Sequence, residues 1–277
     1  MKELNVEQLK QVELGILRQV HKVCAENGIK YSLCGGTLLG AVRHGGYIPW
    51  DDDIDILMPR PDYEKFILYC KNNDTPFNLI CNQTQPKYGY LFAKACSRET
   101  VIEEIYTNRK GAEYGVYIDI FPIDGLGESY AEAKKVYDKT EFRRELLVAA
   151  NWKKYFRSKT HAWYYEPARF AFYLLSRFVS YTKSVNSIEK DCKSHGFENS
   201  SLAGCVCGAY RLKEIMDKSV FAELTTMTFE GEEFFVMKNY DSYLKALFGD
   251  YMQLPPEEKR VTHHTFRAYY KDGEGEL

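Results

Sequence analysis

Trp50-Asp51-Asp52-Asp53-Ile54-Asp55-Ile56 is the most informative segment of this sequence. Acidic and aliphatic side chains alternate from Asp53 to Met58, and this alternation predicts a strand. Because residues two apart in a strand point to the same face, Asp53 and Asp55 are expected to address one cleft together. Asp51 is expected to lie close to them.

Gly35-Gly36-Thr37 precedes these acids, with Asp53 17 residues after Gly36. We expect a short strand over 30–34 to run into the two glycines and a helix over 37–44 to follow them. Glycine allows a close approach of the backbone to a bound group, and a helix N-terminus favours an anion such as phosphate. Gly35, Gly36 and Thr37 are therefore predicted to contact a phosphate-bearing ligand.

Asp119 lies in the apolar segment Tyr117-Ile118-Asp119-Ile120-Phe121, which is short enough for a strand. Acids gathered in such surroundings repel one another and resist desolvation, so a compensating charge is needed. Mg²⁺ commonly takes one or two carboxylates together with phosphate oxygens and water. We predict that Asp53, Asp55 and Asp119 bind Mg²⁺, with Mn²⁺ as the alternative. Asp119 is also a candidate to accept the proton of an attacking hydroxyl.

Each feature also has a purely structural interpretation. Two acids separated by one residue are often only solvated surface groups, and paired glycines are common in turns. An acid among aliphatic residues is often satisfied by backbone donors. The three features together, in this order around expected strands, favour a site for metal and phosphate.

The remaining pattern mixes helices and strands, which predicts an α/β (α+β) fold. An amphipathic helix is expected over 5–27, where Asn5 and Gln8 fit a capping box and Gly28 fits a C-terminal stop. Further helices are expected at 61–71, at 129–195 with breaks, and at 239–248. Strands are expected at 53–58, 77–81, 90–96 and 116–121, and a hairpin at 227–237.

The composition is that of an ordinary globular protein. The 277 residues include 45% hydrophobic and 27% charged residues, and the net charge of −2 gives no reason to expect nucleic acid as a partner. Met1-Lys2-Glu3-Leu4 does not begin an apolar signal segment, and the eight cysteines lie scattered, so we expect reduced thiols and a cytoplasmic protein. Zinc binding by Cys192, His195, Cys205 and Cys207 is an open alternative, although their spacing fits no standard zinc finger.

Basic and aromatic residues gather between Arg143 and Lys183. Nine basic and only two acidic residues give this segment a charge of +7, and it contains Trp152 and Trp163. One interpretation is contact with an anionic membrane surface, where Trp, Tyr, Lys and Arg meet the lipid headgroups. The other is a helical subdomain that packs its aromatic residues into the core.

The motifs resemble those of the LicD family of phosphocholine transferases, which is related to fukutin and fukutin-related protein. The resemblance is carried by Gly36-Thr37-Leu38-Leu39-Gly40-Ala41-Val42-Arg43-His44, Ile48-Pro49-Trp50-Asp51-Asp52-Asp53-Ile54-Asp55-Ile56, Arg60-Pro61-Asp62-Tyr63-Glu64 and Ile118-Asp119-Ile120-Phe121-Pro122-Ile123-Asp124. Phe229-Glu230-Gly231 and Gly249-Asp250-Tyr251-Met252 resemble its C-terminal segment. The resemblance covers most of the chain.

This resemblance implies a nucleotidyltransferase-like core with a mixed sheet over 1–128, a helical basic and aromatic region over 129–200 for the acceptor or a membrane surface, and a C-terminal region over 201–277 that completes the site. It implies that Asp51, Asp53, Asp55 and Asp119 are the catalytic acids and that Arg43 and Lys94 contact donor phosphates. His263 and His264 resemble a family histidine without an assigned role.

The activity implied by the resemblance is transfer of phosphocholine, or a similar alcohol phosphate, from CDP-choline or another CDP-alcohol. The acceptor would be a sugar hydroxyl of a lipid-linked or polymeric cell-surface glycan, such as lipopolysaccharide or teichoic acid, with release of CMP at the inner face of the membrane. One alternative is a nucleotidyltransferase that places NMP on a small hydroxyl compound and releases pyrophosphate. A DxD sugar transferase and a scaffold without catalysis are weaker alternatives, because few residues precede Asp53 and the acids are intact.

Overall fold

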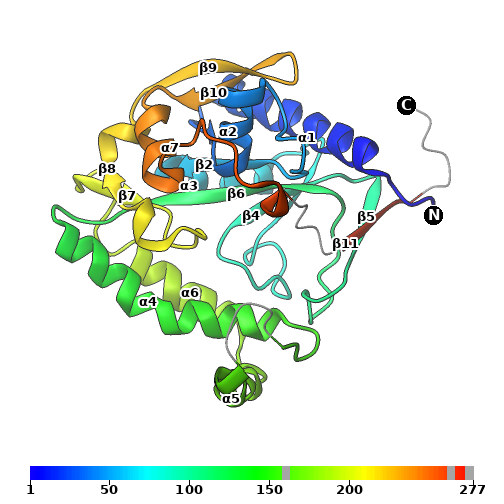
Figure 1. The fold of residues 1–277 in the computed structure, drawn as a ribbon, viewed down its shortest axis with the longest axis vertical. Coiled ribbons are helices and arrows are strands. Elements are labelled where there is room, and N and C mark those ends of the chain that lie inside the picture. Colours follow the sequence, from blue (N-terminus) through cyan, green and yellow to red (C-terminus); the bar gives the residue numbers. More distant parts are fainter. Residues whose placement is uncertain (158–162, 261–265, 272–277) are drawn as a thin grey trace.

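The computed structural model describes residues 1–157, 163–260 and 266–271. The helices are α1 (Val6–Asn27), α2 (Gly35–His44), α3 (Arg60–Asn72), α4 (Tyr130–Asn151), α5 (Glu166–Ser176), α6 (Tyr181–Cys192) and α7 (Tyr240–Phe248) (Figure 1). The strands are β1 (Ser32–Leu33), β2 (Asp55–Pro59), β3 (Asn78–Ile80), β4 (Ala93–Cys96), β5 (Thr100–Glu104), β6 (Tyr117–Gly125), β7 (Leu202–Gly204), β8 (Met216–Asp217), β9 (Leu224–Phe229), β10 (Glu232–Met237) and β11 (Phe266–Tyr270). Short 3₁₀ helices lie at Trp163–Tyr165, Arg211–Glu214, Lys218–Phe221 and Glu257–Lys259.

The long strand β6 is the centre of a seven-stranded mixed sheet. Its first half lies between β2, which runs parallel to it, and β4, which runs antiparallel. β1 extends the sheet beyond β2, and β3 extends it beyond β4. The last residues of β6 pair with β7, which in turn pairs with β8. The predicted α/β fold with a mixed sheet is confirmed.

Local capping signals place the helices as the sequence predicts. Asn5 accepts a hydrogen bond from the backbone of Gln8, whose side chain bonds back to the Asn5 backbone, and Gly28 ends α1 in the left-handed conformation with φ 57°. At the turn between β9 and β10, Glu230 and Gly231 both have positive φ, which closes the expected hairpin.

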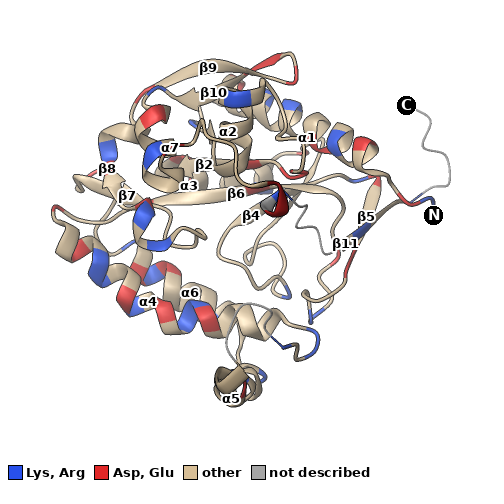
Figure 2. Cartoon of the chain, in the orientation of Figure 1, with Lys and Arg blue, Asp and Glu red and all other residues tan. Residues whose placement is uncertain are grey.

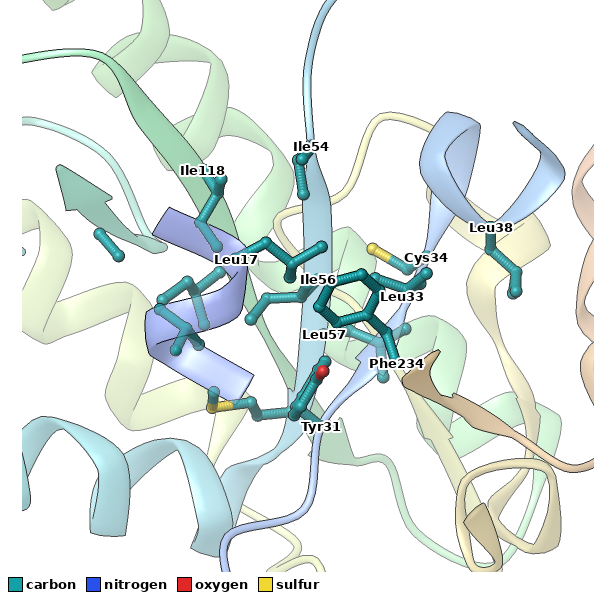
Figure 3. Packing of buried hydrophobic residues seen from close by; sticks show 14 of the residues in the cluster. Leu17, Tyr31, Leu33, Cys34, Leu38, Ile54, Ile56, Leu57, Ile118 and Phe234 are labelled. Carbon is teal, nitrogen blue, oxygen red and sulfur yellow. The ribbon is translucent and has the colours of Figure 1, made fainter. Parts of the chain in front are cut away.

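One large core joins distant parts of the chain around the sheet. Leu17 of α1, Ile56 of β2 and Ile118 of β6 pack together, and Phe234 of β10 reaches the same cluster (Figure 3). Ala268 of β11 also belongs to this core, so residues from both ends of the chain contribute to it. The three-part division of the chain stays a prediction.

A second core forms below the sheet in Figure 1, where α4 and α6 pack against each other. Val136 and Leu147 of α4 meet Tyr181 and Ile188 of α6 there. The expected helical region over 129–195 is therefore three helices, of which α5 contributes no residue to this core. The prediction that this region is helical is confirmed, with its breaks before and after α5.

Several parts of the fold differ from the expectation. β5 and β11 form an antiparallel pair that the sequence pattern did not indicate, because each is a short edge strand with exposed residues. β1 has only two residues, and β4 begins at Ala93 instead of 90. β2 begins at Asp55 instead of 53, so Asp53 precedes the strand and the prediction that it shares a strand face with Asp55 is wrong. The expected strand at 116–121 is longer and continues through Pro122 to Gly125.

Candidate active site

The turn between β1 and α2 brings the backbone close to two of the acids. Gly35 has φ 53°, a conformation that side chains with a Cβ rarely adopt, and its N–H donates to the Tyr243 hydroxyl at 3.3 Å. A Cβ added at Gly36 would lie only 2.5 Å from Oδ2 of Asp51. The paired glycines are needed because the N-terminus of α2 and the Asp51 carboxylate approach each other so closely.

Thr37 ties the same helix to the start of the acidic strand. Its Oγ1 accepts a hydrogen bond from the N–H of Asp55 at 2.8 Å, and its hydroxyl lies 3.5 Å from the carbonyl oxygen of Asp53. Cys34, just before α2, donates its N–H to the carbonyl of Asp55 at 3.1 Å. These bonds position the acids, while the predicted contact of Thr37 with a ligand stays a prediction.

Asp55 and Asp119 are direct partners on the neighbouring parallel strands β2 and β6. Residues in register on adjacent strands point to the same face of the sheet, so the two carboxylates share one side. Ile54 fixes this register, because its carbonyl accepts the N–H of Asp119 at 3.0 Å. The sheet thus unites two acids that are 64 residues apart in the sequence.

The electrostatics show that the four predicted acids are crowded. Burial raises the pKa of Asp55 well above its usual range, and the charges of Asp53, Asp119 and Asp51 raise it further. Burial followed by the charge of Asp52 raises the pKa of Asp51. Mutual repulsion of this kind favours a site that binds a cation.

Lys94 is the nearest compensating charge. It lies opposite Asp119 in the antiparallel pair of β4 and β6, and its Nζ is 2.5 Å from Oδ1 of Asp119. Burial raises the pKa of Asp119, while the Lys94 ammonium acts in the opposite direction. Lys94 therefore stabilises an acid of the site, and its predicted contact with a donor phosphate stays a prediction.

Arg43 lies at the other end of α2 from the glycines. The helical rise of about 1.5 Å per residue separates Arg43 from Gly35 by about 12 Å along the axis. Its Nη1 donates to the carbonyl of Tyr251 at 3.0 Å, and its Nε to Nε2 of His44 at 3.0 Å. Arg260 is close enough to lower the pKa of Arg43, after burial. Any contact of Arg43 with the donor stays a prediction, and His263 and His264 lie outside the described residues.

A cavity of about 80 Å³ opens beside Asp55. Gly35 and Phe121 line it from the sheet side, and Tyr210, Glu214 and Tyr243 come from the last third of the chain. A larger cavity of about 330 Å³ is lined by α4 and by the segment around Tyr90 and shares Gly208 and Ala209 with the smaller one.

Glu214 is a candidate that the sequence reasoning missed. It is buried at the cavity wall, accepts the N–H of Tyr210 at 3.0 Å, and burial raises its pKa to about 7. Tyr243 was also missed, although it holds Gly35. No local pattern distinguishes either residue, since both lie more than 150 residues after Asp55. Only the packing of α7 against α2 and against the 3₁₀ helix Arg211–Glu214 brings them to the acids.

The chemistry of Asp53, Asp55 and Asp119 fits a hard cation, since all three offer only oxygen ligands. Across residues 1–157, 163–260 and 266–271, however, no group of three His, Cys, Asp or Glu side chains is arranged as a ready-made metal site. After burial, the charges of Asp53 and Asp119 raise the pKa of Asp55, and the charge of Asp53 raises that of Asp119. The metal set stays a prediction.

The same finding bears on zinc. Sγ of Cys205 lies 3.5 Å from Sγ of Cys207, but the thiol pKa of Cys205 is raised by this contact and by burial, and burial also raises that of Cys192. His195 lies instead beside Gly127, where an added Cβ would be 3.1 Å from its Nδ1. The described residues therefore give the zinc alternative no support.

A comparison with known proteins places these residues in a family. Residues 28–148 match the family model described as LicD/FKTN/FKRP, nucleotidyltransferase domain. The chain is 32% identical, over 97% of its length and 99% of the relative's, to the lipopolysaccharide cholinephosphotransferase LicD of Haemophilus influenzae. The chain belongs to the LicD family. The resemblance seen in the sequence is confirmed, and with it the prediction of an enzyme of the transferase class.

A shorter similarity leads to a relative with another activity in its name. The chain is 54% identical over 39 residues to the ribitol 5-phosphate transferase FKRP of human and of mouse, which is 14% of this chain and 8% of that protein. All the predicted site residues lie within the part that the LicD-family model matches, whereas Glu214 and Tyr243 lie beyond it. Among the described helices, none combines the length and the apolar character that crossing a bilayer requires.

Proposed function

We propose that this LicD-family chain transfers phosphocholine from CDP-choline to a sugar hydroxyl of a cell-surface glycan precursor and releases CMP. The carrying observation is the placement of Asp55 and Asp119 side by side on β2 and β6, facing the glycine turn at the N-terminus of α2. Carboxylates beside a helix N-terminus suit a diphosphate that is bridged by a cation. The near full-length similarity to a cholinephosphotransferase supports choline as the alcohol.

In the proposed reaction, the sugar hydroxyl attacks the phosphorus that carries choline. A new bond forms between the sugar oxygen and this phosphorus, and the bond to the CMP oxygen breaks in line with it. A Mg²⁺ ion held by Asp53, Asp55 and Asp119 would neutralise charge on the diphosphate. The N-terminus of α2, which begins at Gly35, would offer backbone N–H donors to phosphate oxygens, and a carboxylate of the site would take the hydroxyl proton.

The cavity beside Asp55 and the larger cavity that shares Gly208 and Ala209 with it suit the two organic groups. The smaller one is lined by Tyr210 and Tyr243, and aromatic rings recognise a quaternary ammonium through cation–π contacts. The larger one, bordered by Arg144, Glu145 and Arg211, has the polar side chains that a sugar acceptor needs. We place choline in the first and the acceptor in the second, at the cytoplasmic face of the membrane.

The test measures CMP release from CDP-choline with Mg²⁺, with and without a lipid-linked sugar acceptor. Wild type is compared with Asp55→Asn and with Asp138→Asn, a control that removes an acid on the surface of α4. We expect release with wild type and the control, and its loss in EDTA or in Asp55→Asn. CMP release only from CDP-ribitol or CDP-glycerol would show that the donor carries another alcohol than choline. Pyrophosphate release from an NTP would show that the enzyme is a nucleotidyltransferase instead.

A further inference from the structure

Helix α5 turns its apolar side to solvent. The outer stripe, as we call it, consists of Trp163, Phe170, Leu174, Leu175 and Phe178, all of them exposed. Trp163 and Phe178 are 80% and 89% exposed, which is unusual for such large apolar side chains. Phe170 and Leu174 are four residues apart in α5 and so lie on the same side of the helix, while Trp163 and Phe178 flank its two ends.

The opposite side of α5 is held to the body by polar and aromatic contacts. Arg177, just after the helix, donates to the carbonyls of Trp152 and Ala149 at the end of α4. The guanidinium of Arg169 lies 5.4 Å from the centre of the Trp152 ring. These contacts fix the orientation of α5 and leave the outer stripe facing solvent. α5 lies at the edge of the molecule, below α4 in Figure 1.

The surroundings of the outer stripe are basic. Residues 152–183 contain seven basic residues and a single acid, Glu166. Glu166 is occupied within the molecule, since it accepts the hydroxyl of Tyr155 and lies 3.6 Å from Arg169. Lys154, Arg157 and Lys183 are exposed, and Figure 2 shows blue segments next to α5.

Aromatic residues mark the start of α5. Tyr164 and Tyr165 are exposed beside Trp163, immediately before the helix. Trp and Tyr favour the boundary between lipid headgroups and acyl chains, because each joins an apolar ring to a polar group. A helix of 11 residues extends only about 16 Å, which is about half the hydrocarbon thickness, so α5 can lie in this boundary and cannot cross it.

We propose that α5 docks this protein on an anionic lipid bilayer, with the outer stripe inserted at the headgroup boundary and the surrounding Lys and Arg side chains against lipid phosphates. An apolar strip rimmed by positive charge, with its one acid neutralised, complements such a surface better than it complements a protein of mixed charge. Docking also orients the larger cavity, because Leu147 and Val148 of α4 line it directly before Ala149, one of the residues that hold α5.

The test is co-sedimentation of the full chain with vesicles of phosphatidylcholine alone and with a third of phosphatidylglycerol. The variant Phe170→Asp, Leu174→Asp, Phe178→Asp removes the outer stripe. The control Val6→Asp, Leu68→Asp, Tyr130→Asp makes the same charge change at exposed apolar residues on other helices. We expect wild type and the control to bind the anionic vesicles and the stripe variant to lose about tenfold or more in partitioning. Equal binding of both variants would overturn the proposal.

A second measurement needs no disruptive substitution. Trp163 is exposed in the free protein, so its fluorescence should shift to shorter wavelength when anionic vesicles are added and the shift should be absent in Trp163→Phe. An unshifted spectrum would contradict insertion of the outer stripe into lipid. A dimer that light scattering detects for wild type but not for the stripe variant would show that the outer stripe binds a second copy of the chain. Neither readout depends on CMP release, so the docking and the proposed transfer can fail separately.

Discussion

Nζ of Lys94 lies 2.5 Å from Oδ1 of Asp119, across the antiparallel pair of β4 and β6. Lys94 is 3% exposed, and its Nζ also lies 3.2 Å from the centre of the Tyr117 ring. A buried ammonium of this kind is stable only with a partner, and Lys94 has the carboxylate of Asp119 as that partner.

Replacing Lys94 should therefore destabilise the protein through Asp119. We expect Lys94→Met to lower the free energy of unfolding by about 3–5 kcal/mol, because a largely buried carboxylate loses its counter-charge. Asp119→Asn in the same chain should recover part of this loss. Urea unfolding of wild type, both single variants and the double variant in EDTA gives a double-mutant cycle. If the two changes in unfolding free energy simply add, Lys94 and Asp119 are not coupled.

A Cβ at position 36 should disturb the site without unfolding the protein. In Gly36→Ala the new atom would lie 2.5 Å from Oδ2 of Asp51, so this carboxylate has to move. We expect the rate of CMP release to fall about tenfold or more, which corresponds to about 1.4 kcal/mol in the barrier. The unfolding temperature should change little, because the atom that has to move is the terminal carboxylate oxygen of Asp51 and not part of the backbone.

Gly15→Ala is the matched control for this substitution. Gly15 lies within α1 and no atom is found within 4 Å of an added Cβ. Alanine should stabilise the helix by about 0.5–1 kcal/mol and leave CMP release unchanged. Equal rates of CMP release by Gly36→Ala and Gly15→Ala would show that the close approach of Gly36 to Asp51 does not matter for the reaction.

Glu214 should make stability depend on pH. Its pKa is raised to about 7 by burial, above the usual 4.5, so the folded protein holds a proton that the unfolded chain releases. The contribution of this proton to the free energy of unfolding is fully present below about pH 4.5. It is lost as pH rises through about 7, which lowers the free energy of unfolding by about 3 kcal/mol. Glu214→Gln should be insensitive to this change, because the amide stays neutral and still accepts from Tyr210.

The measurement is the difference in unfolding free energy between wild type and Glu214→Gln at pH 5 and pH 8. Other buried acids titrate in the same direction in both proteins, so the difference isolates Glu214. We expect the unfolding free energy of Glu214→Gln to increase relative to that of wild type as pH rises from 5 to 8. A difference that is constant with pH would show that Glu214 is ionised throughout.

Arg60 and Asp124 should matter for folding and not for the reaction. Nε and Nη2 of Arg60 donate to the two carboxylate oxygens of Asp124 at 2.6 and 2.9 Å, which ties the start of α3 to the end of β6. Asp124→Ala should lower the unfolding free energy by about 3–5 kcal/mol, since the guanidinium stays buried without a partner. Arg60→Met with Asp124→Leu should lose less than the sum of the single changes. Loss of CMP release per folded molecule in Asp124→Ala would contradict a purely structural role.

The sequence indicated the acids and the turn because those signals are local. Asp53 and Asp55 alternate with aliphatic residues, and Asn5 and Gln8 form the capping box of α1 within a few residues. The parallel pairing of Asp55 with Asp119 was expected only as proximity, and β5 and β11 were missed. Their pairing depends on the path of more than 150 intervening residues.

The alternation of acids, the glycine turn and the capping residues by themselves determined an α/β fold, the position of the candidate site along the chain, and a motif set that indicated the family. Tertiary structure alone decided that Lys94 neutralises Asp119, that Glu214 and Tyr243 border Asp55, and that α5 presents its apolar side outward. The reason is range: backbone propensity and caps act over a few residues, whereas burial and charge pairing arise only when distant strands and helices are packed together.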